Sequence, residues 1–134
     1  MKSMRFLFLL LGCAMAVLPL SAEEQKAYKG AHISFERTEC NFGEVSRKGE
    51  DKVCIFHFVN DGTEPLVVLA ATTSCSCLKA EFSRKPIAVG EGGEIRLLLE
   101  SKKVEKGVFH RIVQIRSNSV GGTEILTIKG VAKD

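Results

Sequence analysis

Apolar and polar residues alternate along most of this chain, which is the pattern of half-buried β-strands. In residues 53–59, Cys54, Phe56 and Phe58 occupy one face and His57 the other. No segment repeats apolar residues at helical spacing for long enough to predict a helix. The alternation predicts about seven strands, near residues 40–45, 53–59, 66–71, 79–82, 94–100, 108–116 and 124–131.

Turn-forming residues separate these segments. Asn60-Asp61-Gly62 ends the second segment, glycines at 90–93 precede the fifth, and residues 117–122 precede the last. The nearly continuous apolar run at 66–71 favours a central strand. Roughly seven short strands separated by turns are typical of an immunoglobulin-like β-sandwich. We therefore predict an all-β fold, a single immunoglobulin-like β-sandwich.

The first 22 residues have the composition of an export signal. Lys2 and Arg5 form a positive region, and residues 6–20 form an apolar one. A membrane span needs about 20 apolar residues, and Pro19 interrupts this run, so we expect no span in the mature form. We predict a cleaved signal peptide at 1–22, a flexible leader at 23–30 and the sandwich domain at 31–134, exported to the periplasm or cell surface.

An alternative for this N-terminus is acylation. Residues 10–13, Leu-Leu-Gly-Cys, resemble a bacterial lipoprotein box, in which Cys13 would carry a lipid anchor and become the new N-terminus. The apolar run continues past Cys13 to Leu20, whereas a lipoprotein normally turns polar after its cysteine. Cleavage near residue 22 is therefore favoured, with acylation of Cys13 left open.

Composition narrows the function classes. Cleavage leaves 134 − 22 = 112 residues, the size of one ordinary domain. Loss of Lys2 and Arg5 reduces 19 basic residues to 17 against 16 acidic ones, a net charge of about +1. Nucleic-acid binding usually leaves a basic stripe, and one tyrosine with no tryptophan is a poor platform for stacking bases. We expect a protein partner and no nucleic acid.

Four cysteines remain after cleavage: Cys40, Cys54, Cys75 and Cys77. An even number in an exported chain favours disulfides. Cys40 shares its strand face with Phe42, and Cys54 shares one with Phe56, so both should face the core. A Cys40–Cys54 bridge and two buried free thiols stay open as alternatives, because strand register decides whether the Cβ atoms come within about 4 Å.

The stretch Thr73-Ser74-Cys75-Ser76-Cys77 carries the only strong chemical signal. In an extended segment, both sulfurs would project to one side and would bind one Cu(I). In a tight turn, they would form a small disulfide that exchanges with a partner thiol. The third interpretation is structural, with the pair bonded to each other or to Cys40 or Cys54. It is favoured, because a lone Cys-x-Cys is a weak metal motif and no thioredoxin-type Cys-x-x-Cys is present.

The histidines give little support to an enzyme. His32 lies at the start of the domain, and His57 and His110 lie within alternating strands, where each is expected to be half-exposed. A Cys–His nucleophile pair stays open, because such partners need not be sequence neighbours. We see no Ser-His-Asp arrangement or phosphate-binding loop with recognisable context, and we expect a protein that is not an enzyme.

Several stretches along nearly the whole mature chain match a known pattern. They are Asn41-Phe42-Gly43-Glu44-Val45 and residues 56–62, 65–66, 73–77, 86–90, 107–109, 117–118 and 126–130. They resemble a family of secreted bacterial proteins, common in Bacteroidetes, called domain of unknown function 1573, which looks related to the immunoglobulin-like domains of the major sperm protein and Hydin group. The resemblance implies the same fold and export, and no catalytic residues. The family's commonest signature has Cys-Gly-Cys where this chain has Cys75-Ser76-Cys77.

The sequence therefore predicts an exported, non-catalytic binding or assembly module that presents loops or an open sheet edge to another protein. The alternative belongs to another class, a periplasmic thiol protein in which Cys75 and Cys77 bind Cu(I) or exchange disulfides.

Overall fold

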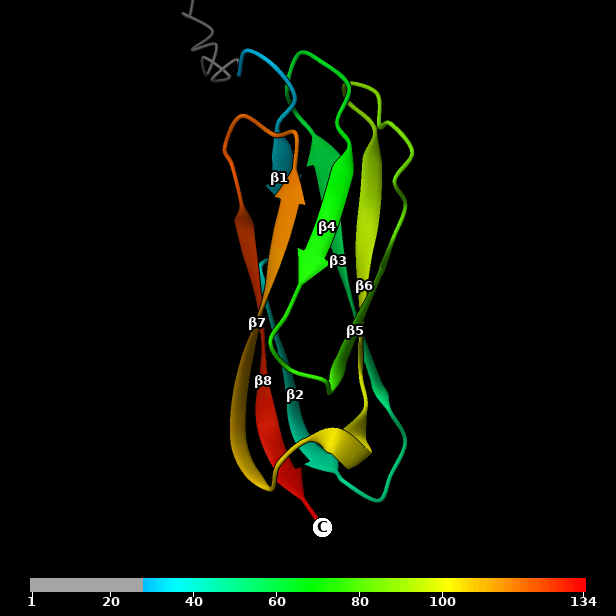
Figure 1. Cartoon of the computed structure of the whole chain (residues 1–134), viewed down its shortest axis with the longest axis vertical. Helices are drawn as coiled ribbons and strands as arrows, with labels where there is room; N and C mark the ends of the chain where they lie inside the picture. The colour runs from blue at the N-terminus through cyan, green and yellow to red at the C-terminus, as the bar shows by residue number, and fades with distance from the viewer. Residues whose placement is uncertain (1–27) are drawn as a thin grey trace, which may run out of the picture.

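The computed structural model describes residues 28–134 (Figure 1). The expected signal peptide at 1–22, with Cys13, and residues 23–27 of the expected leader lie outside this range. Within it, no helix is long and apolar enough to cross a membrane.

Residues 28–134 form two four-stranded sheets that pack face to face (Figure 1). The strands are β1 (Ile33–Phe35), β2 (Glu39–Ser46), β3 (Lys52–Asn60), β4 (Val68–Thr72), β5 (Leu78–Phe82), β6 (Gly92–Leu99), β7 (Gly107–Ser117) and β8 (Glu124–Lys133), with one 3-10 turn, η1 (Ser101–Lys103). One sheet has the order β1-β3-β6-β5 and the other β2-β8-β7-β4. Neighbouring strands are antiparallel except β2 and β8, which run parallel. The predicted all-β, immunoglobulin-like sandwich is confirmed.

The core lies between the two sheets and follows the alternation of the sequence. Phe56 of β3 and Leu97 of β6 are completely buried, and they meet Phe109 and Ile115 of β7 and Leu126 of β8 from the opposite sheet. Burying each such side chain stabilises the fold by about 1.5–3 kcal/mol relative to leaving it exposed. The apolar positions of the strands therefore face inward and hold the sheets together.

The prediction of a central strand at 66–71 was wrong. The observed strand, β4, lies at the edge of its sheet and pairs only with β7. Leu66 precedes it and is buried in an isolated bridge with Ile87. Leu69 is 46% exposed at a register shift between Val68 and residue 70. The apolar run thus combines a buried bridge with an edge strand.

Asn60 ties together the loops at one end of the sandwich. Its side chain is completely buried. Its Nδ2 donates to the carbonyl oxygens of Glu64 at 2.8 Å and Ile87 at 3.0 Å. Its Oδ1 accepts from the backbone N–H groups of Gly62 at 3.1 Å and His32 at 3.3 Å. These bonds offset the cost of burying an amide and fix the turn predicted at 60–62.

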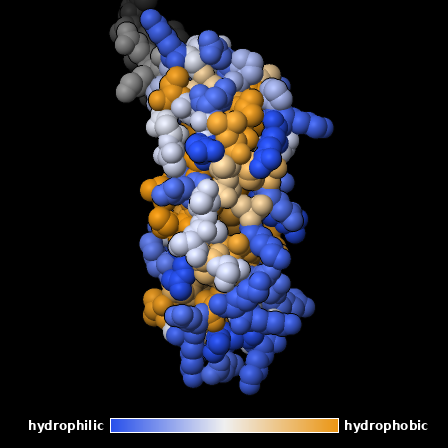
Figure 2. Space-filling model, viewed as in Figure 1, coloured by the Kyte–Doolittle hydropathy of each residue, from blue (hydrophilic) through white to orange (hydrophobic). Residues whose placement is uncertain are grey.

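The opposite end of the sandwich, which carries η1, is covered by hydrophilic residues (Figure 2). Asp134 lies 2.8 Å from Arg47 Nη1 and 3.1 Å from Lys106 Nζ. Lys133 Nζ lies 2.6 Å from Glu44. Exposed ion pairs of this kind contribute about 0–1 kcal/mol each to the stability of the fold. This end of the sandwich is therefore a hydrated, charged surface.

Candidate functional site

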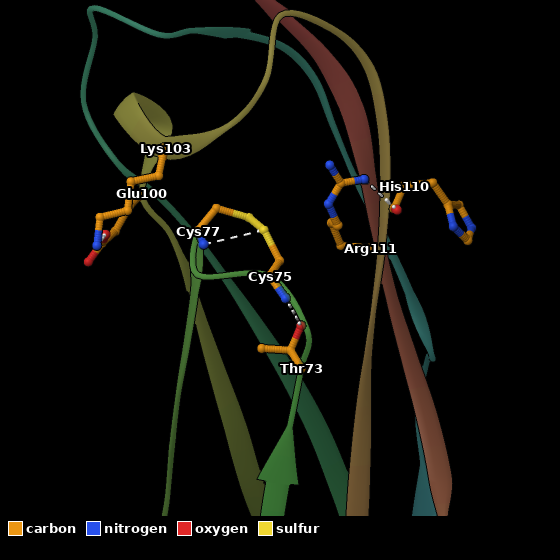
Figure 3. The surroundings of a disulfide bond; sticks show 7 residues. All are labelled: Thr73, Cys75, Cys77, Glu100, Lys103, His110 and Arg111. Atoms are coloured by element: carbon orange, nitrogen blue, oxygen red, sulfur yellow. Dashed lines mark hydrogen bonds and ion pairs between the residues drawn. A yellow bond between two sulfur atoms is a disulfide. The ribbon is translucent and has the colours of Figure 1, made fainter.

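Cys75 and Cys77 lie in the loop that carries the chain from β4 in one sheet to β5 in the other (Figures 1 and 3). The structure joins them in a disulfide, with the Cα atoms 5.2 Å apart. Cys77 is completely buried in the core, whereas Cys75 is half-buried and Ser74 and Ser76 beside it are exposed. The two cysteines of one disulfide therefore differ in their exposure to solvent.

Backbone hydrogen bonds fix this loop. The N–H of Cys75 donates to Thr73 Oγ1 at 3.3 Å, and the N–H of Cys77 points at Cys75 Sγ, also at 3.3 Å (Figure 3). The N–H of Leu78 donates to the Cys75 carbonyl at 3.3 Å, and that of Glu100 donates to the Cys77 carbonyl at 2.7 Å. An N–H directed at a sulfur favours negative charge on that sulfur.

Glu100, whose backbone anchors Cys77, has two cations around its carboxylate. Lys103 Nζ lies at 2.6 Å and Lys79 Nζ at 2.7 Å. Hydrogen bonds from Lys103 and then Lys79 lower the pKa of Glu100 from 4.5 to about 2. The carboxylate is thus ionised at neutral pH and links the start of β5 with η1, directly after β6.

Arg111 is the residue at this site that the sequence analysis missed. It belongs to the inner face of β7, between Phe109 and Val113, which are buried. It is half-buried, and its side chain lies on the side of β7 that faces the disulfide, with Nη1 donating to the His110 carbonyl at 3.0 Å (Figure 3). Among residues 28–134, none of the ion pairs involves it. The sequence could have pointed to it, because Arg111 is a charged residue at a position where the alternation of the strand predicted at 108–116 places core-facing apolar residues.

A hollow of about 250 Å³ adjoins the Cys75–Cys77 loop. The loop residues Thr73 and Ser74 line it together with Thr72, Ile112 and Gln114 of the neighbouring strands β4 and β7. The Ile112 side chain is 41% exposed there. An apolar floor with hydroxyl and amide groups around it suits one apolar side chain of a partner protein.

Cys40 and Cys54 form the second disulfide; their Cα atoms are 6.7 Å apart, and the two residues are 14 positions apart in sequence. Both are buried, at 8% and 3% exposure. Cys40 belongs to β2 and Cys54 to β3, which are consecutive in the chain but lie in different sheets. The bridge therefore ties the two sheets to each other at one side of the sandwich.

An open groove of about 690 Å³ runs along this side, between the edge strand β2 and the part of β3 that β1 does not cover. Its lining is mainly apolar and disulfide surface flanked by charged or polar groups: Glu36, Arg37, Cys40, Phe42, Val53, Cys54, Ile55 and His57. β1 pairs only with residues 58–60 of β3. Residues 52–57 of β3 thus have no strand beside them on this edge within the described chain.

Arg37 covers part of this edge. Its Nη2 donates to the Ile55 carbonyl at 3.1 Å and to Cys54 Sγ at 3.3 Å. Its guanidinium carbon lies 5.6 Å from the centre of the Phe56 ring. Charged residues commonly protect sheet edges from unwanted pairing. Within the described chain, this part of the edge is therefore covered by an exposed side chain rather than by a strand.

The histidines lie apart from the cysteine pair or point away from it. His32 stacks on Tyr28 with ring centres 3.6 Å apart and contacts Asp61 through Nδ1. His57 is exposed at the β2–β3 groove. His110 lies on the far side of β7 from the disulfide (Figure 3). Within residues 28–134, no group of three or more His, Cys, Asp or Glu side chains is placed to hold a metal ion.

The comparisons with known proteins identify the family. A family model described as "Protein of unknown function (DUF1573)" matches residues 33–132. The chain belongs to the DUF1573 family. The resemblance stated from the sequence is thereby confirmed. Among curated proteins, none matches this DUF1573 chain.

Solved structures similar to this DUF1573 domain share its fold. A Porphyromonas gingivalis W83 protein of unknown function has 18% identity and a TM-score of 0.68 over 77% of this chain, which spans 47% of that protein. The PapD-like domain 7 of human CEP192 has 10% identity and a TM-score of 0.57, covering 76% of this chain and 85% of that one. The YadV chaperone has 12% identity and a TM-score of 0.55, covering 76% and 52%. The domain is thus an immunoglobulin-like sandwich similar to PapD-like domains.

Proposed function

We propose that this DUF1573 domain is an exported, non-catalytic binding or assembly module that holds an extended segment of another protein in the groove between β2 and β3. The observation that carries the proposal is the edge of β3 at residues 52–57, beside which no strand lies within the described chain. The His57 carbonyl accepts from the Glu36 N–H at 3.0 Å, and the Ile55 carbonyl accepts from Arg37. Alternate residues of an antiparallel strand point their N–H and C=O groups to the same side, so Val53, Ile55 and His57 present theirs to the groove.

An added strand would use the groups of Val53 and Ile55 and cover the apolar lining, whereas the His57 carbonyl already accepts from the Glu36 N–H. Main-chain hydrogen bonds to a sheet edge supply affinity, and pockets for alternate side chains supply specificity. Phe42 and Val53 would receive the apolar side chains of the bound segment, and Arg37 would have to leave the Ile55 carbonyl. The partner is thus a protein segment that alternates apolar and polar residues.

Two further observations support the class and the location. Similar folds include a protein described as a chaperone, which favours a protein-binding role. Two disulfides in one small domain favour an oxidising compartment such as the periplasm or cell surface. Processing at residue 22 or acylation of Cys13 would both deliver the domain there.

A photo-crosslinking amino acid at position 53 tests the proposal in cells. Val53 is 40% exposed in the groove, and Ile125, which is 49% exposed outside it, serves as the matched control position. We expect a discrete adduct from position 53, mapping to an extended segment of the partner, and none from position 125. Ile55→Pro should abolish the adduct, because it removes an outward N–H without removing a bond to β6. Equal adducts from both positions, or an adduct that survives Ile55→Pro, would contradict the groove assignment.

A second candidate function is that of a thiol protein. The observation that favours it is the disulfide between Cys75, which is half-buried, and Cys77, which is completely buried. Binding of Cu(I) would require reduction of this pair first, since thiolates are the metal ligands. The double variant Cys75→Ser/Cys77→Ser separates the two functions. A binding module would keep its crosslink at position 53, whereas a thiol protein would lose its function while staying folded.

A further inference from the structure

The two sulfurs of the Cys75–Cys77 disulfide differ in access, hydrogen bonding and surroundings. We propose that Cys75 is the sulfur that bonds covalently to a partner protein during disulfide exchange, and that Cys77 is the buried resolving thiol. This inference rests on the second candidate function, disulfide exchange, and assigns its chemistry and substrate class.

Access gives the first argument. An attacking thiolate must reach the sulfur that it bonds to, approaching from the side opposite the bond that breaks. Cys75 is half-buried between the exposed residues Ser74 and Ser76, whereas Cys77 has no exposed surface. A thiolate of another protein therefore reaches Cys75 and does not reach Cys77.

Local charge gives the second argument. The N–H of Cys77 points at Cys75 Sγ at 3.3 Å. Arg111 adds a cation on the side of β7 that faces the disulfide (Figure 3). Hydrogen-bond donors and nearby cations stabilise a thiolate. The reduced pair thus keeps its reactive thiolate on the accessible sulfur, Cys75, and its proton on Cys77.

The hollow beside the loop gives the substrate class. Ile112 and Gln114 line it on the outer face of β7, opposite to the side of Arg111, and Thr73 and Ser74, directly before Cys75, line it at the edge of the sheet. A polypeptide whose cysteine reaches Cys75 and whose chain crosses Thr73 and Ser74 would place a side chain near that cysteine in this hollow. The exposed Ile112 favours an apolar neighbour. The substrate is accordingly a protein thiol flanked by an apolar residue.

Disulfide exchange at this site transfers two electrons from the partner to the Cys75–Cys77 pair. A partner thiolate attacks Cys75 Sγ, the bond between Cys75 and Cys77 breaks, and its electron pair leaves on Cys77, which takes up a proton. A second partner thiolate then attacks the partner's sulfur in the mixed disulfide, and Cys75 leaves as a thiolate. The partner dithiol has lost two electrons to form a disulfide, and the Cys75–Cys77 pair has gained them. A partner disulfide that reacts in the reverse direction restores the oxidised pair.

The role of each sulfur is tested with Cys77→Ala and Cys75→Ala in the mature chain, each with Cys40–Cys54 intact. Alanine avoids a polar group at the buried position 77. The probe is a synthetic peptide with one cysteine beside a leucine, activated as a 2-thiopyridyl disulfide, so that release of the thiopyridine is followed by absorbance. We expect Cys77→Ala, which keeps Cys75, to react roughly tenfold or more faster than Cys75→Ala. Equal rates, or a faster Cys75→Ala, would overturn the assignment.

Three further measurements complete the test. Unfolding curves must show that both variants are folded. Ile112→Thr in the Cys77→Ala background should remove the preference for this peptide over one with serine in place of leucine. Arg111→Gln should move the pH profile of the reaction to higher pH, whereas Arg111→Lys should not; an unchanged profile would remove Arg111 from the site.

The function itself is tested separately with the oxidised wild-type protein and a two-cysteine peptide. One peptide disulfide formed per protein supports exchange. No oxidation of the peptide would reject the function together with the inference. Oxidation that proceeds while Cys75→Ala is the faster variant would reject only the assignment of the two sulfurs.

Discussion

Replacing Cys40 and Cys54 by alanine should lower the free energy of unfolding by about 3 kcal/mol. The two cysteines are 14 positions apart, so the bridge closes a loop of 14 + 1 = 15 residues. The chain-entropy expression for such a loop gives about 10 cal/mol/K, or about 3 kcal/mol at 25 °C. At roughly 4 °C per kcal/mol for a domain of about this size, the melting temperature should fall by roughly 12 °C.

The assay is urea denaturation followed by circular dichroism, because the chain has no tryptophan to report by fluorescence. The matched control is the double variant Cys75→Ala/Cys77→Ala. Its bridge spans 2 positions and closes a loop of 2 + 1 = 3 residues. The same expression gives about 1.6 kcal/mol for that loop. The variant that lacks the bridge between the sheets should therefore lose roughly twice as much stability as the control.

Two results would refute this reasoning. Equal losses in the two double variants would show that loop length does not set the effect. A loss below about 1 kcal/mol, with the denaturant slope unchanged, would show that the bridge does not restrict the unfolded chain. A changed slope would instead place the effect in the compactness of the unfolded state.

Three other predictions address particular groups. Because two lysines lower the pKa of Glu100 from 4.5 to about 2, the unfolded state binds more protons between these values. Stability should therefore decrease as pH falls from 4.5 to 2, and Glu100→Gln should flatten part of this decrease in urea titrations at several pH values. Asn60→Ala should cost roughly 3 kcal/mol, because it leaves buried groups without partners; a loss below 1 kcal/mol in urea would contradict this. Gly130→Ala places a Cβ 2.7 Å from Phe109 Cζ and should cost roughly 1–3 kcal/mol by urea denaturation. Gly121→Ala, whose nearest contacts are 3.6 Å or more, is its control and should change stability little.

The sequence predicts the positions of the strands better than it predicts which strands pair with each other. Alternation identifies which residues face the core, so the segments around Phe56 and Phe109 are placed well. β1 was not predicted, because three residues are too few for alternation to be recognised. Periodicity also cannot say which strands pair. The central position expected for residues 66–71 was wrong for this reason, and the order that puts β2 and β3 in opposite sheets could not be foreseen.

The candidate sites, too, could be predicted from the sequence only in part. Their spacing in the sequence is enough to identify Cys75 and Cys77 as an unusual pair. The alternation of the strands, which places Cys40 and Cys54 on core-facing positions, is enough to make these two residues candidates for a bridge. Whether two sulfurs meet depends on strand register and on how a loop crosses between sheets, which are properties of the assembled fold. The β2–β3 groove is of this kind too, because an unpaired edge exists only once the other pairings are known. Arg111 was predictable in principle, as a charge among inward-facing apolar residues.

The position of β8 has a consequence for the order in which this protein can form. β8 lies between β2 and β7, and its parallel pairing joins residue 39 to residue 127. β2, made early in synthesis, thus finds no strand to pair with until residues 124–133 have left the ribosome. Pairing between such distant segments is slow, because the entropy of closing the long loop is lost before any contact between the two strands compensates for it. The sheet that contains β2 therefore cannot be completed until nearly the whole domain has been synthesised.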